Sequence, residues 1–442
     1  MQTHFSPEQL ADAHVADLEK IIRSCVHCGF CTATCPTYVV GRDERDSPRG
    51  RIYLIKELLE TGRAPDAHDV EPLDHCLSCL SCETTCPSGV TYRRLIDHAR
   101  IEVETRYARD PLDRALRSLL VWLLPHRRRF RAAIGLAKLG RPLAPLLARL
   151  PQVGPRLEAM LRLAPARLPP RDGSERPGVF KAPGSVPGRR RVALLTGCAQ
   201  SVLAPEINAA AIRVLNRAGI DAVLAKGEGC CGSLAHHLGR EATARASARA
   251  LIDVWMREID GDGLDAILVT ASGCGATIKD YGVLLADDPA YADKAARVAA
   301  LAKDPSEYLL GLELAFPAPR RLRAAYHSAC SLQHGMKILD APKKLLAAAG
   351  FTVLTPAEAH LCCGSAGVYN ILQPKIADEL RDRKARNLQR LRPDVIAAGN
   401  IGCLTQIGSA TPTPVAHIVE LVDWAQGGPA PTGVTERALS AS

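Results

Sequence analysis

Eight of the 16 cysteines in the chain form two motifs that share one spacing. The sequence reads Cys25-x2-Cys28-x2-Cys31-x3-Cys35-Pro36 in the first motif and Cys76-x2-Cys79-x2-Cys82-x3-Cys86-Pro87 in the second. This spacing is typical of cysteine thiolates that bind [4Fe–4S] cubane clusters. Because such clusters accept and release single electrons, the two motifs predict electron transfer.

The spacing also predicts which cysteines share a cluster. Three thiolates two residues apart on a tight loop bind three irons of one cube, while the fourth, followed by proline, points to the other cluster. We therefore expect one cluster on Cys25, Cys28, Cys31 and Cys86, and a second on Cys76, Cys79, Cys82 and Cys35. The alternative is a scaffold held by structural zinc without redox function, because C-x2-C is also zinc spacing. Zinc would require neither the third cysteine nor the proline, so the pattern favours iron and sulfide.

The other eight cysteines recur as two sets of four. The first set is Cys198, Cys230, Cys231 and Cys274, and the second is Cys330, Cys362, Cys363 and Cys403. The first three members are separated from their counterparts by 132 residues, and the last by 129. A constant offset indicates an internal duplication. The thiols of each copy predict a metal, a cluster or a redox-active site, and the alternative is that they are small buried residues that pack like alanine.

Two kinds of structure are expected to position these cysteines. Around the first eight, helical periodicity indicates α-helices, for example over 50–61, where a helix can begin after Ser47-Pro48. In each duplicated copy, apolar runs such as 266–270 are typical of strands in a buried parallel sheet. The cysteines follow the strand ends, where open α/β sheets hold their sites. Gly232 and Gly364, which follow the adjacent cysteines, permit backbone geometry that a Cβ would forbid.

The predicted fold is therefore α+β and multidomain. We expect an α-helical ferredoxin domain with two [4Fe–4S] clusters over residues 1–110, a basic helical connector and linker over 111–190, and a duplicated α/β cysteine-rich domain with repeats over 191–318 and 319–430. In the connector, prolines such as Pro125 break short amphipathic helices, and the Pro/Gly-rich stretch 169–190 is interpreted as a linker.

The connector also carries the positive charge of the chain. The net charge is +9, and residues 112–190 hold 17 Lys and Arg against 4 Asp and Glu, so the other residues sum to −4. This local surplus and an aromatic content of 4% argue against nucleic-acid binding. The surplus, with Trp122 and leucines beside Arg127, Arg128 and Arg129, predicts either contact with anionic lipid or a solvated or partner-binding surface.

The sequence shows no secretory leader and no run of about 18 apolar residues. We therefore expect a cytoplasmic protein, with a peripheral contact on the inner face of the cytoplasmic membrane as an option.

Four arginines lie close to the cluster motifs: Arg49, Arg51, Arg93 and Arg94. They would raise the reduction potentials if their charge reached the clusters, and otherwise would be solvated surface residues.

Each duplicated copy contains two adjacent cysteines followed by glycine, and we call the copies CCG repeats. The chain, with its two tetracysteine motifs and two CCG repeats, resembles the iron–sulfur subunits of the heterodisulfide reductase/glycolate oxidase group. Within that group it is most similar to the glycolate oxidase type. The resemblance is carried by residues 46–60 (DSPRGRIYLIKELLE), 75–90 (HCLSCLSCETTCPSGV) and 399–407 (GNIGCLTQI), and it covers nearly the whole chain apart from the connector. One departure concerns the last cysteine of each set. In heterodisulfide reductases this cysteine begins a C-x2-C pair that completes a noncubane cluster. In this chain the second position of the pair is Thr277 in the first copy and Gln406 in the second. Full noncubane clusters are therefore not expected, which leaves a smaller metal site or none.

The resemblance implies an electron-transfer subunit of a glycolate oxidase/dehydrogenase complex, an oxidoreductase acting on a 2-hydroxy acid. A flavoprotein partner with FAD would oxidise glycolate to glyoxylate, and this chain would relay single electrons to a quinone-type acceptor. The sequence contains neither a G-x-G-x-x-G nor a P-loop motif, so we expect no hydride chemistry and no catalytic side chain here. The alternatives are a subunit serving lactate or glycerol 3-phosphate, and a CCG-type disulfide reductase.

Overall fold

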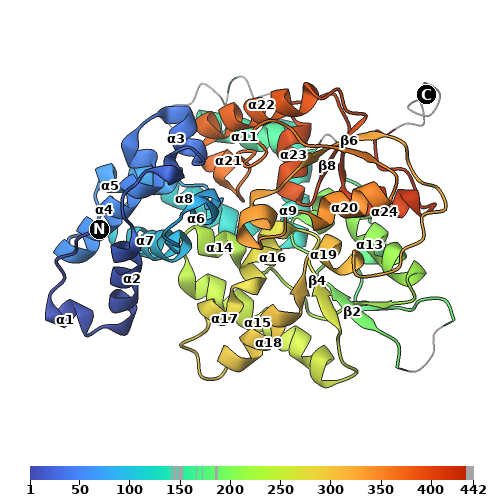
Figure 1. Cartoon of the computed structure of the whole chain (residues 1–442), viewed down its shortest axis with the longest axis horizontal. Helices are drawn as coiled ribbons and strands as arrows, with labels where there is room; N and C mark the ends of the chain where they lie inside the picture. Colours follow the sequence, from blue (N-terminus) through green and yellow to red (C-terminus); the bar gives the residue numbers. More distant parts are fainter. Residues whose placement is uncertain are drawn as a thin grey trace.

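The computed structural model describes residues 1–434 apart from 141, 143–145, 147–152, 166, 172 and 185–187. The chain forms a helical N-terminal part, a set of connecting helices and two α/β units, each built on its own sheet. Figure 1 shows the N-terminal helices at one end, beside the two α/β units. None of the helices in the described ranges is long and apolar enough to cross a bilayer.

The N-terminal part consists of short helices joined by the cysteine loops. Its elements are α1 (Pro7–Leu10), α2 (Ala13–Ser24), η1 (Phe30–Thr32), α3 (Pro36–Gly41), η2 (Glu44–Asp46), α4 (Pro48–Thr61), α5 (Ala67–His75), α6 (Ser81–Thr85) and α7 (Tyr92–Arg106). The predicted helix over 50–61 is confirmed as α4, since Ser47 caps its N-terminus through the amide of Gly50 and Pro48 occupies its first turn. α2, α4 and α7 bury a common apolar core that includes Leu18, Ile55 and Leu95.

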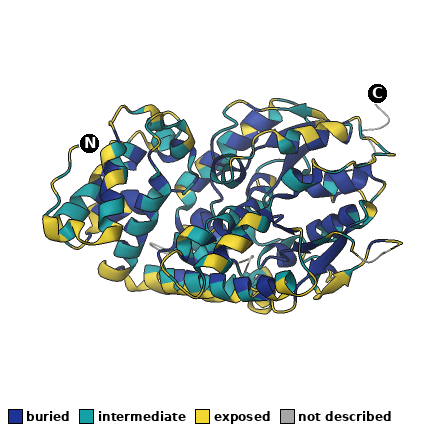
Figure 2. Ribbon diagram, turned by 60° about the horizontal axis from the view of Figure 1, so that its bottom comes forward, coloured by how far each residue is buried: buried dark blue, intermediate teal, exposed yellow. Residues whose placement is uncertain are grey.

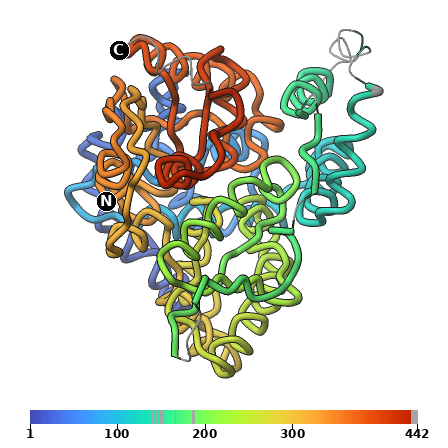
Figure 3. The backbone as a smooth tube through the Cα atoms, turned by 90° about the vertical axis from the view of Figure 1, so that its right-hand side faces the viewer, coloured from blue at the N-terminus to red at the C-terminus, as the bar shows by residue number. Residues whose placement is uncertain are grey.

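In the described part of the connector, the helices α8 (Pro111–Leu123), α9 (Arg127–Gly140) and α11 (Gly154–Leu163) lie along one side of the molecule. Figure 3 shows them as the cyan-to-teal part of the tube. Pro125 lies between α8 and α9, as predicted for a helix-breaking proline. Asp113 accepts hydrogen bonds from Arg117 at 2.8 Å and Arg156 at 2.6 Å, and Arg117 also reaches Asp74 of α5 at 2.8 Å. These ion pairs attach the connector to the N-terminal part.

The first α/β unit is built on a five-stranded sheet. Its elements are η4 (Gly173–Glu175), β1 (Gly178–Phe180), β2 (Arg191–Leu194), α12 (Gln200–Leu203), α13 (Glu206–Arg217), β3 (Asp221–Leu224), α14 (Ser233–His237), α15 (Glu241–Asp260), β4 (Ala266–Leu268), α16 (Ser272–Lys279), α17 (Tyr281–Leu284), α18 (Ala292–Leu301), β5 (Ala302–Lys303) and α19 (Pro305–Leu309). β1 comes from the stretch interpreted as a linker and pairs antiparallel with β3. Part of that stretch therefore belongs to the sheet.

The second unit is built on a four-stranded sheet. Its elements are β6 (Arg323–His327), η5 (Ser331–Gly335), α20 (Ala341–Ala348), β7 (Thr352–Leu354), α21 (Tyr369–Leu372), α22 (Pro374–Gln389), β8 (Val395–Ala398), α23 (Ile401–Gly408), β9 (Val415–His417) and α24 (Ile418–Ala425).

The two sheets confirm the predicted duplication. The parallel strands have the order β3-β2-β4-β5 in the first unit and β7-β6-β8-β9 in the second. One hydrogen bond is repeated in detail, since the amide of Arg191 donates to Asp265 and that of Arg323 donates to Asp394, both at 2.7 Å. The α+β architecture expected from the sequence is therefore the observed one.

The two units share one apolar core. α13 of the first packs against α24 of the second, and side chains from both sheets meet there in a buried cluster that includes Val214 and Trp424. The dark blue ribbon in Figure 2 follows the strands and these inner helices. At the edge of this contact, the buried carboxylate of Asp423 accepts hydrogen bonds from Arg213 at 2.7 Å and Arg217 at 2.5 Å.

Removing the carboxylate of Asp423 tests how much this ion pair stabilises the contact. We expect Asp423→Ala to lower the free energy of unfolding by about 2 kcal/mol, because the charge-assisted hydrogen bonds from both arginines across the units are lost. Thermal denaturation measures the change. As a control, Asp262→Ala removes an 83% exposed carboxylate 3.4 Å from Arg191 and should cost less than about 0.5 kcal/mol. Equal melting temperatures for the two variants would contradict this account.

Candidate functional site

The first tetracysteine motif forms a loop between α2 and α3. Cys25 ends α2, Cys31 lies in η1, and Cys86 ends α6 from the second motif. With Cys28, these residues line one small cavity, which Cys82 also borders. The structure thus brings together the four cysteines predicted to share the first cluster. Burial raises the pKa of the Cys31 thiol to about 11, so a cation must replace the proton for this sulfur to act as a ligand.

The second motif is more deeply buried. Cys76 ends α5, Cys82 lies in α6 and Cys35 precedes α3. Burial raises the pKa of the Cys82 thiol well above its ordinary value, and the neighbouring sulfurs of Cys79, Cys76 and Cys35 act in the same direction. The sulfurs of Cys79, Cys76 and Cys35 thus lie within electrostatic reach of Cys82, as does that of Cys31 from the first motif. Which iron each thiolate binds stays a prediction.

Arg51 places a positive charge beside this second group. Its side chain is 1% exposed and donates to Cys35 Sγ at 3.8 Å, to Asp46 Oδ1 at 3.2 Å and to the carbonyl of Pro72 at 2.6 Å. The hydroxyl of Tyr92 donates to Cys76 Sγ at 3.7 Å. Donors to sulfur stabilise added negative charge, so they raise the reduction potential of a bound cluster.

The other three arginines near the motifs have different positions. Arg49 lies over the first loop, where a Cβ added to Gly29 would be 2.6 Å from Arg49 Nη1. Arg93 bridges to the first α/β unit through Asp280, at 2.5 Å. Arg94 forms a half-exposed ion pair with Asp17 at 3.0 Å. Of the four predicted arginines, Arg49 and Arg51 thus lie beside a cysteine loop, and Arg93 also pairs with Glu83 inside the second motif at 3.3 Å. Arg100, which the sequence did not single out, donates to the carbonyl of Cys76 at 2.6 Å.

The cysteines of the first repeat converge at the carboxyl ends of its strands. Cys198 follows β2, Cys230 and Cys231 follow β3, and Cys274 lies in the first turn of α16 after β4. Cys198 donates a hydrogen bond to Cys230 across 3.9 Å, which lowers the pKa of Cys230 and raises that of Cys198. The predicted position at the strand ends is confirmed.

The second repeat places its cysteines in the same way. The Sγ atoms of Cys330 and Cys362 are 3.8 Å apart, and those of Cys363 and Cys403 are 3.4 Å apart. Buried Lys384 lies nearby: burial lowers its pKa, and the Cys363 and Cys362 sulfurs act in the opposite direction. His327, at the end of β6, borders the same group, although the sequence analysis did not single it out.

The glycine after each cysteine pair is required by the backbone. Gly232 and Gly364 both have φ of +85°, and an added Cβ would lie 2.8 Å from the carbonyl oxygen of Ala244 in one repeat and 2.4 Å from that of Ala377 in the other. Their amides each donate to a cysteine sulfur at 3.4 Å. The prediction that a Cβ is forbidden here is confirmed.

A cavity of about 480 Å³ joins the two cysteine sets. All eight cysteines of the repeats line it, together with Cys76 of the second motif. The remaining wall is largely apolar, and the connecting helices contribute Leu120, Phe130, Ile134 and Met160 to it. No sequence motif signals this cavity, because it forms only where three distant parts of the chain meet.

The second motif touches the second repeat directly. Cys79 packs in one buried group with Cys362 and Cys330. Thr84 of α6 and His334 of η5 are joined by a hydrogen bond of 2.7 Å, and Tyr369 donates to the carbonyl of His75 at 3.0 Å. The thiol groups therefore follow one another from the first motif, through the second motif, to the second repeat.

Comparisons with known proteins agree with this arrangement. Residues 21–90 match the 4Fe-4S dicluster domain, and residues 192–279 and 324–408 each match the cysteine-rich domain that is named CCG. The chain is 44% identical over 428 residues to the glycolate oxidase iron–sulfur subunit of Escherichia coli (strain K12), which covers 96% of this chain and 99% of that protein. The chain belongs to the family of glycolate oxidase iron–sulfur subunits.

Other relatives extend this family. The probable glycolate oxidase iron–sulfur subunit of Bacillus subtilis (strain 168) is 32% identical, with 87% of this chain and 88% of that protein covered. Lactate utilization protein A of Bacillus licheniformis is 25% identical over 53% of this chain and 99% of that protein. A hypothetical protein from Helicobacter pylori has a similar fold, with a TM-score of 0.55 at 10% identity over 97% of this chain and 74% of that chain.

The hydrogen bond from Arg51 to Cys35 predicts how a mutation changes the reduction potential of the cluster that Cys35 would bind. We expect Arg51→Lys to lower the reduction potential of the more buried cluster by roughly 50–100 mV, because one charge-assisted donor to its sulfur is lost. A redox titration followed by electron paramagnetic resonance measures the potential. Arg94→Lys, at the half-exposed pair with Asp17, should leave both potentials unchanged. If Arg51→Lys retains its iron and the potential of the unmodified protein, the tuning role is wrong.

Proposed function

We propose that this chain is the electron-transfer subunit of a glycolate oxidase complex. A flavoprotein partner with FAD oxidises glycolate to glyoxylate, and this chain relays the electrons singly to a quinone-type acceptor. The observation that carries the proposal is the near-complete coverage and 44% identity with the E. coli subunit, combined with thiol groups that follow one another through the fold.

The eight N-terminal cysteines would hold the two [4Fe–4S] clusters in the crosswise assignment given by the spacing. The donor sets fit this group: two sets of four cysteines lie close together, and the sulfurs of the second set accept hydrogen bonds from Arg51 and Tyr92. Bound clusters would supply one-electron transfer. The protein holds the ligands in place, excludes water from the second set and provides positive charge beside it.

The first cluster loop offers a contact surface for the flavoprotein. Cys28 is exposed, and its neighbours Val26 and Phe30 are 66% and 64% exposed. Exposed apolar side chains beside a redox site favour partner binding, since burying them stabilises the complex. We propose that electrons enter at the first cluster and leave from the second, beside the cavity that Cys76 lines.

The cavity between the repeats supports a quinone-type acceptor. It borders Cys76 and the thiols of both repeats, and its wall of leucine, phenylalanine and methionine side chains suits an apolar ligand. On the outside of the connector, Trp122 and Leu136 are 54% and 67% exposed, and the guanidinium of Arg129 lies 4.3 Å from the Trp122 ring. Basic and apolar side chains together favour a peripheral contact with anionic lipid, and a cytoplasmic location is consistent with it.

We also propose the domain division expected from the sequence, with boundaries near residues 110, 190 and 318. A disulfide reductase is the second candidate, because three thiol pairs lie within 3.4–3.9 Å. Lactate as substrate is a further candidate, because lactate utilization protein A matches about half of the chain.

Anaerobic co-purification with the flavoprotein tests the proposal. We expect glycolate to reduce a soluble quinone analogue in the complex, and Phe30→Asp to weaken partner binding at least tenfold, because it places a charge in the proposed contact. Phe30→Asp should keep the iron content and cluster spectra of the unmodified chain. Leu136→Asp, equally exposed but on α9, is the matched control and should bind the partner normally.

The same preparation separates the alternatives. To test the substrate, lactate and glycerol 3-phosphate replace glycolate in parallel assays. To test the disulfide reductase, a disulfide replaces the quinone as electron acceptor, and the unmodified chain is compared with Cys362→Ser. Full electron transfer in Phe30→Asp would refute the contact surface. Disulfide reduction that is lost in Cys362→Ser while the cubane spectra persist would favour the reductase.

A further inference from the structure

His327 is a buried polar side chain without a hydrogen-bond partner. It ends β6 and is 1% exposed, and within the described part of the chain neither ring nitrogen has a partner. Burying an imidazole without hydrogen bonds destabilises the folded state, so most buried polar groups are satisfied. An orphaned ring in a rigid core therefore points to a ligand that the ring is placed to bind.

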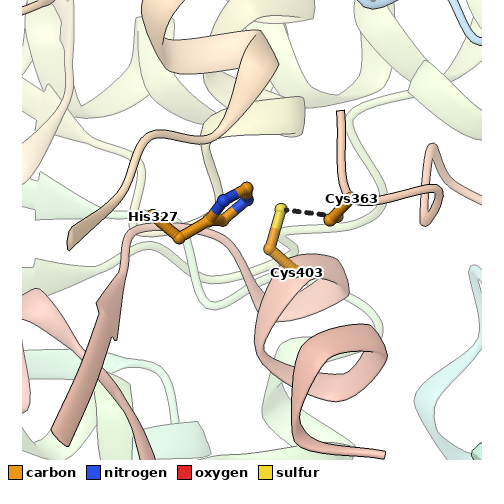
Figure 4. A group of neighbouring side chains, drawn as sticks. All are labelled: His327, Cys363 and Cys403. Carbon is orange, nitrogen blue, oxygen red and sulfur yellow. Dashed lines mark hydrogen bonds between the residues drawn. The ribbon is translucent and has the colours of Figure 1, made fainter. Parts of the chain in front are cut away.

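Two cysteine sulfurs lie beside this ring. A nitrogen of His327 and the Sγ atoms of Cys363 and Cys403 all lie within 4.8 Å of one another, and the two sulfurs are 3.4 Å apart. Figure 4 shows the imidazole of His327 and the Cys403 side chain directed toward each other, with Cys363 on the far side of the Cys403 sulfur. Zinc bonds of about 2.3 Å to sulfur and about 2.0 Å to nitrogen place tetrahedral ligand atoms roughly 3.4–3.8 Å apart. Small side-chain adjustments would bring the three donors to that geometry.

The donors belong to the second repeat alone. The repeated hydrogen bonds of Arg191 and Arg323 fix the alignment of β2 with β6, and this alignment places Leu195 where the second repeat has His327. Both side chains are buried, at 2% and 1% exposure. The duplication therefore keeps the cysteines in both copies and adds a nitrogen donor to one.

A second difference concerns charge. The helices that follow the cysteine pairs can be aligned through Ala244 and Ala377, because each lies beside the glycine of its own cysteine pair. In this alignment Leu251 of the first repeat is the counterpart of Lys384 in the second. The ammonium of Lys384 donates to the carbonyl of Glu358 at 2.7 Å and is held beside the second set of thiols. A fixed cation balances negative charge when several thiols of one site are ionised. The first repeat has leucine at both positions.

We propose that the second repeat binds one divalent metal ion, zinc by its donor set, through His327, Cys363 and Cys403. Two thiolates and one imidazole are ligands that zinc prefers, and all three side chains are at most 3% exposed. Cys363 and Cys403 also line the 480 Å³ cavity, so the fourth position faces it. A zinc site with three protein ligands and one open position is typical of sites that bind or polarise a ligand. The first repeat does not form this site.

This proposal goes beyond the proposed function, because zinc carries no electrons and the site would hold or polarise a ligand in the cavity. Metal analysis of the whole chain, purified anaerobically from zinc-supplemented medium, should find about one zinc per chain in addition to the cluster iron. X-ray absorption at the zinc edge should show two sulfur ligands and at least one nitrogen ligand. This measurement on the unmodified chain needs no variant to fold.

His327→Leu is the decisive variant, because it installs the side chain that the first repeat uses. It should lose at least 80% of the zinc and keep its iron content and cubane spectra. Cys231→Ser, the counterpart of Cys363 in the first repeat, is the matched control and should keep its zinc. His334→Gln, a buried histidine already bonded to Thr84, should keep it as well.

Three outcomes would overturn the proposal: zinc retained in His327→Leu, an absorption edge without a nitrogen ligand, or extra iron in place of zinc with a paramagnetic signal that depends on Cys403. The failure of the proposed function looks different. In that case glycolate would not reduce the acceptor, while the zinc content and its dependence on His327 would be unchanged.

Discussion

A thiolate inside a protein needs positive charge or hydrogen-bond donors, because a low-dielectric interior disfavours the ionised sulfur. Nearly every feature of this fold at its cysteines answers that requirement. Arg51 reaches Cys35, Tyr92 reaches Cys76, and the amides of Gly232 and Gly364 reach a sulfur in each repeat. These donors come from the protein's own backbone and side chains, so the loops are organised for anionic sulfur.

The same requirement explains why three parts of the chain form one body. The second motif contributes Cys76 and Cys79, the repeats contribute their strand ends, and the connecting helices contribute apolar side chains to the wall of the cavity between them. Each contact between parts uses specific polar groups, such as Thr84 with His334 and Arg93 with Asp280. Moving any part would expose sulfur to solvent and separate neighbouring thiol groups.

Much of this could be predicted from the sequence. Cysteine spacing is a local property, so it indicated both motifs and the duplication, and Ser47-Pro48 marked the start of α4 because capping depends on neighbouring residues. β1 was missed because its pairing with β3 is made only in the folded sheet. Arg51 and Arg94 could not be told apart, since burial depends on which helix face packs inward. His327 carries no spacing signal, but its alignment with Leu195 at the offset of 132 would have marked it.

The ion pairs of the connector change how its charge acts at a distance. Arg117, Arg156 and Arg162 each face an aspartate at 2.5–2.8 Å. Paired charges of opposite sign form short dipoles whose potential decays much faster than that of a lone cation, and salt screens what is left within about 10 Å. A tally of arginines therefore overstates the long-range attraction of this segment, and an approaching anionic surface would respond mainly to the few cations, such as Arg129, that project without a carboxylate beside them among the described residues.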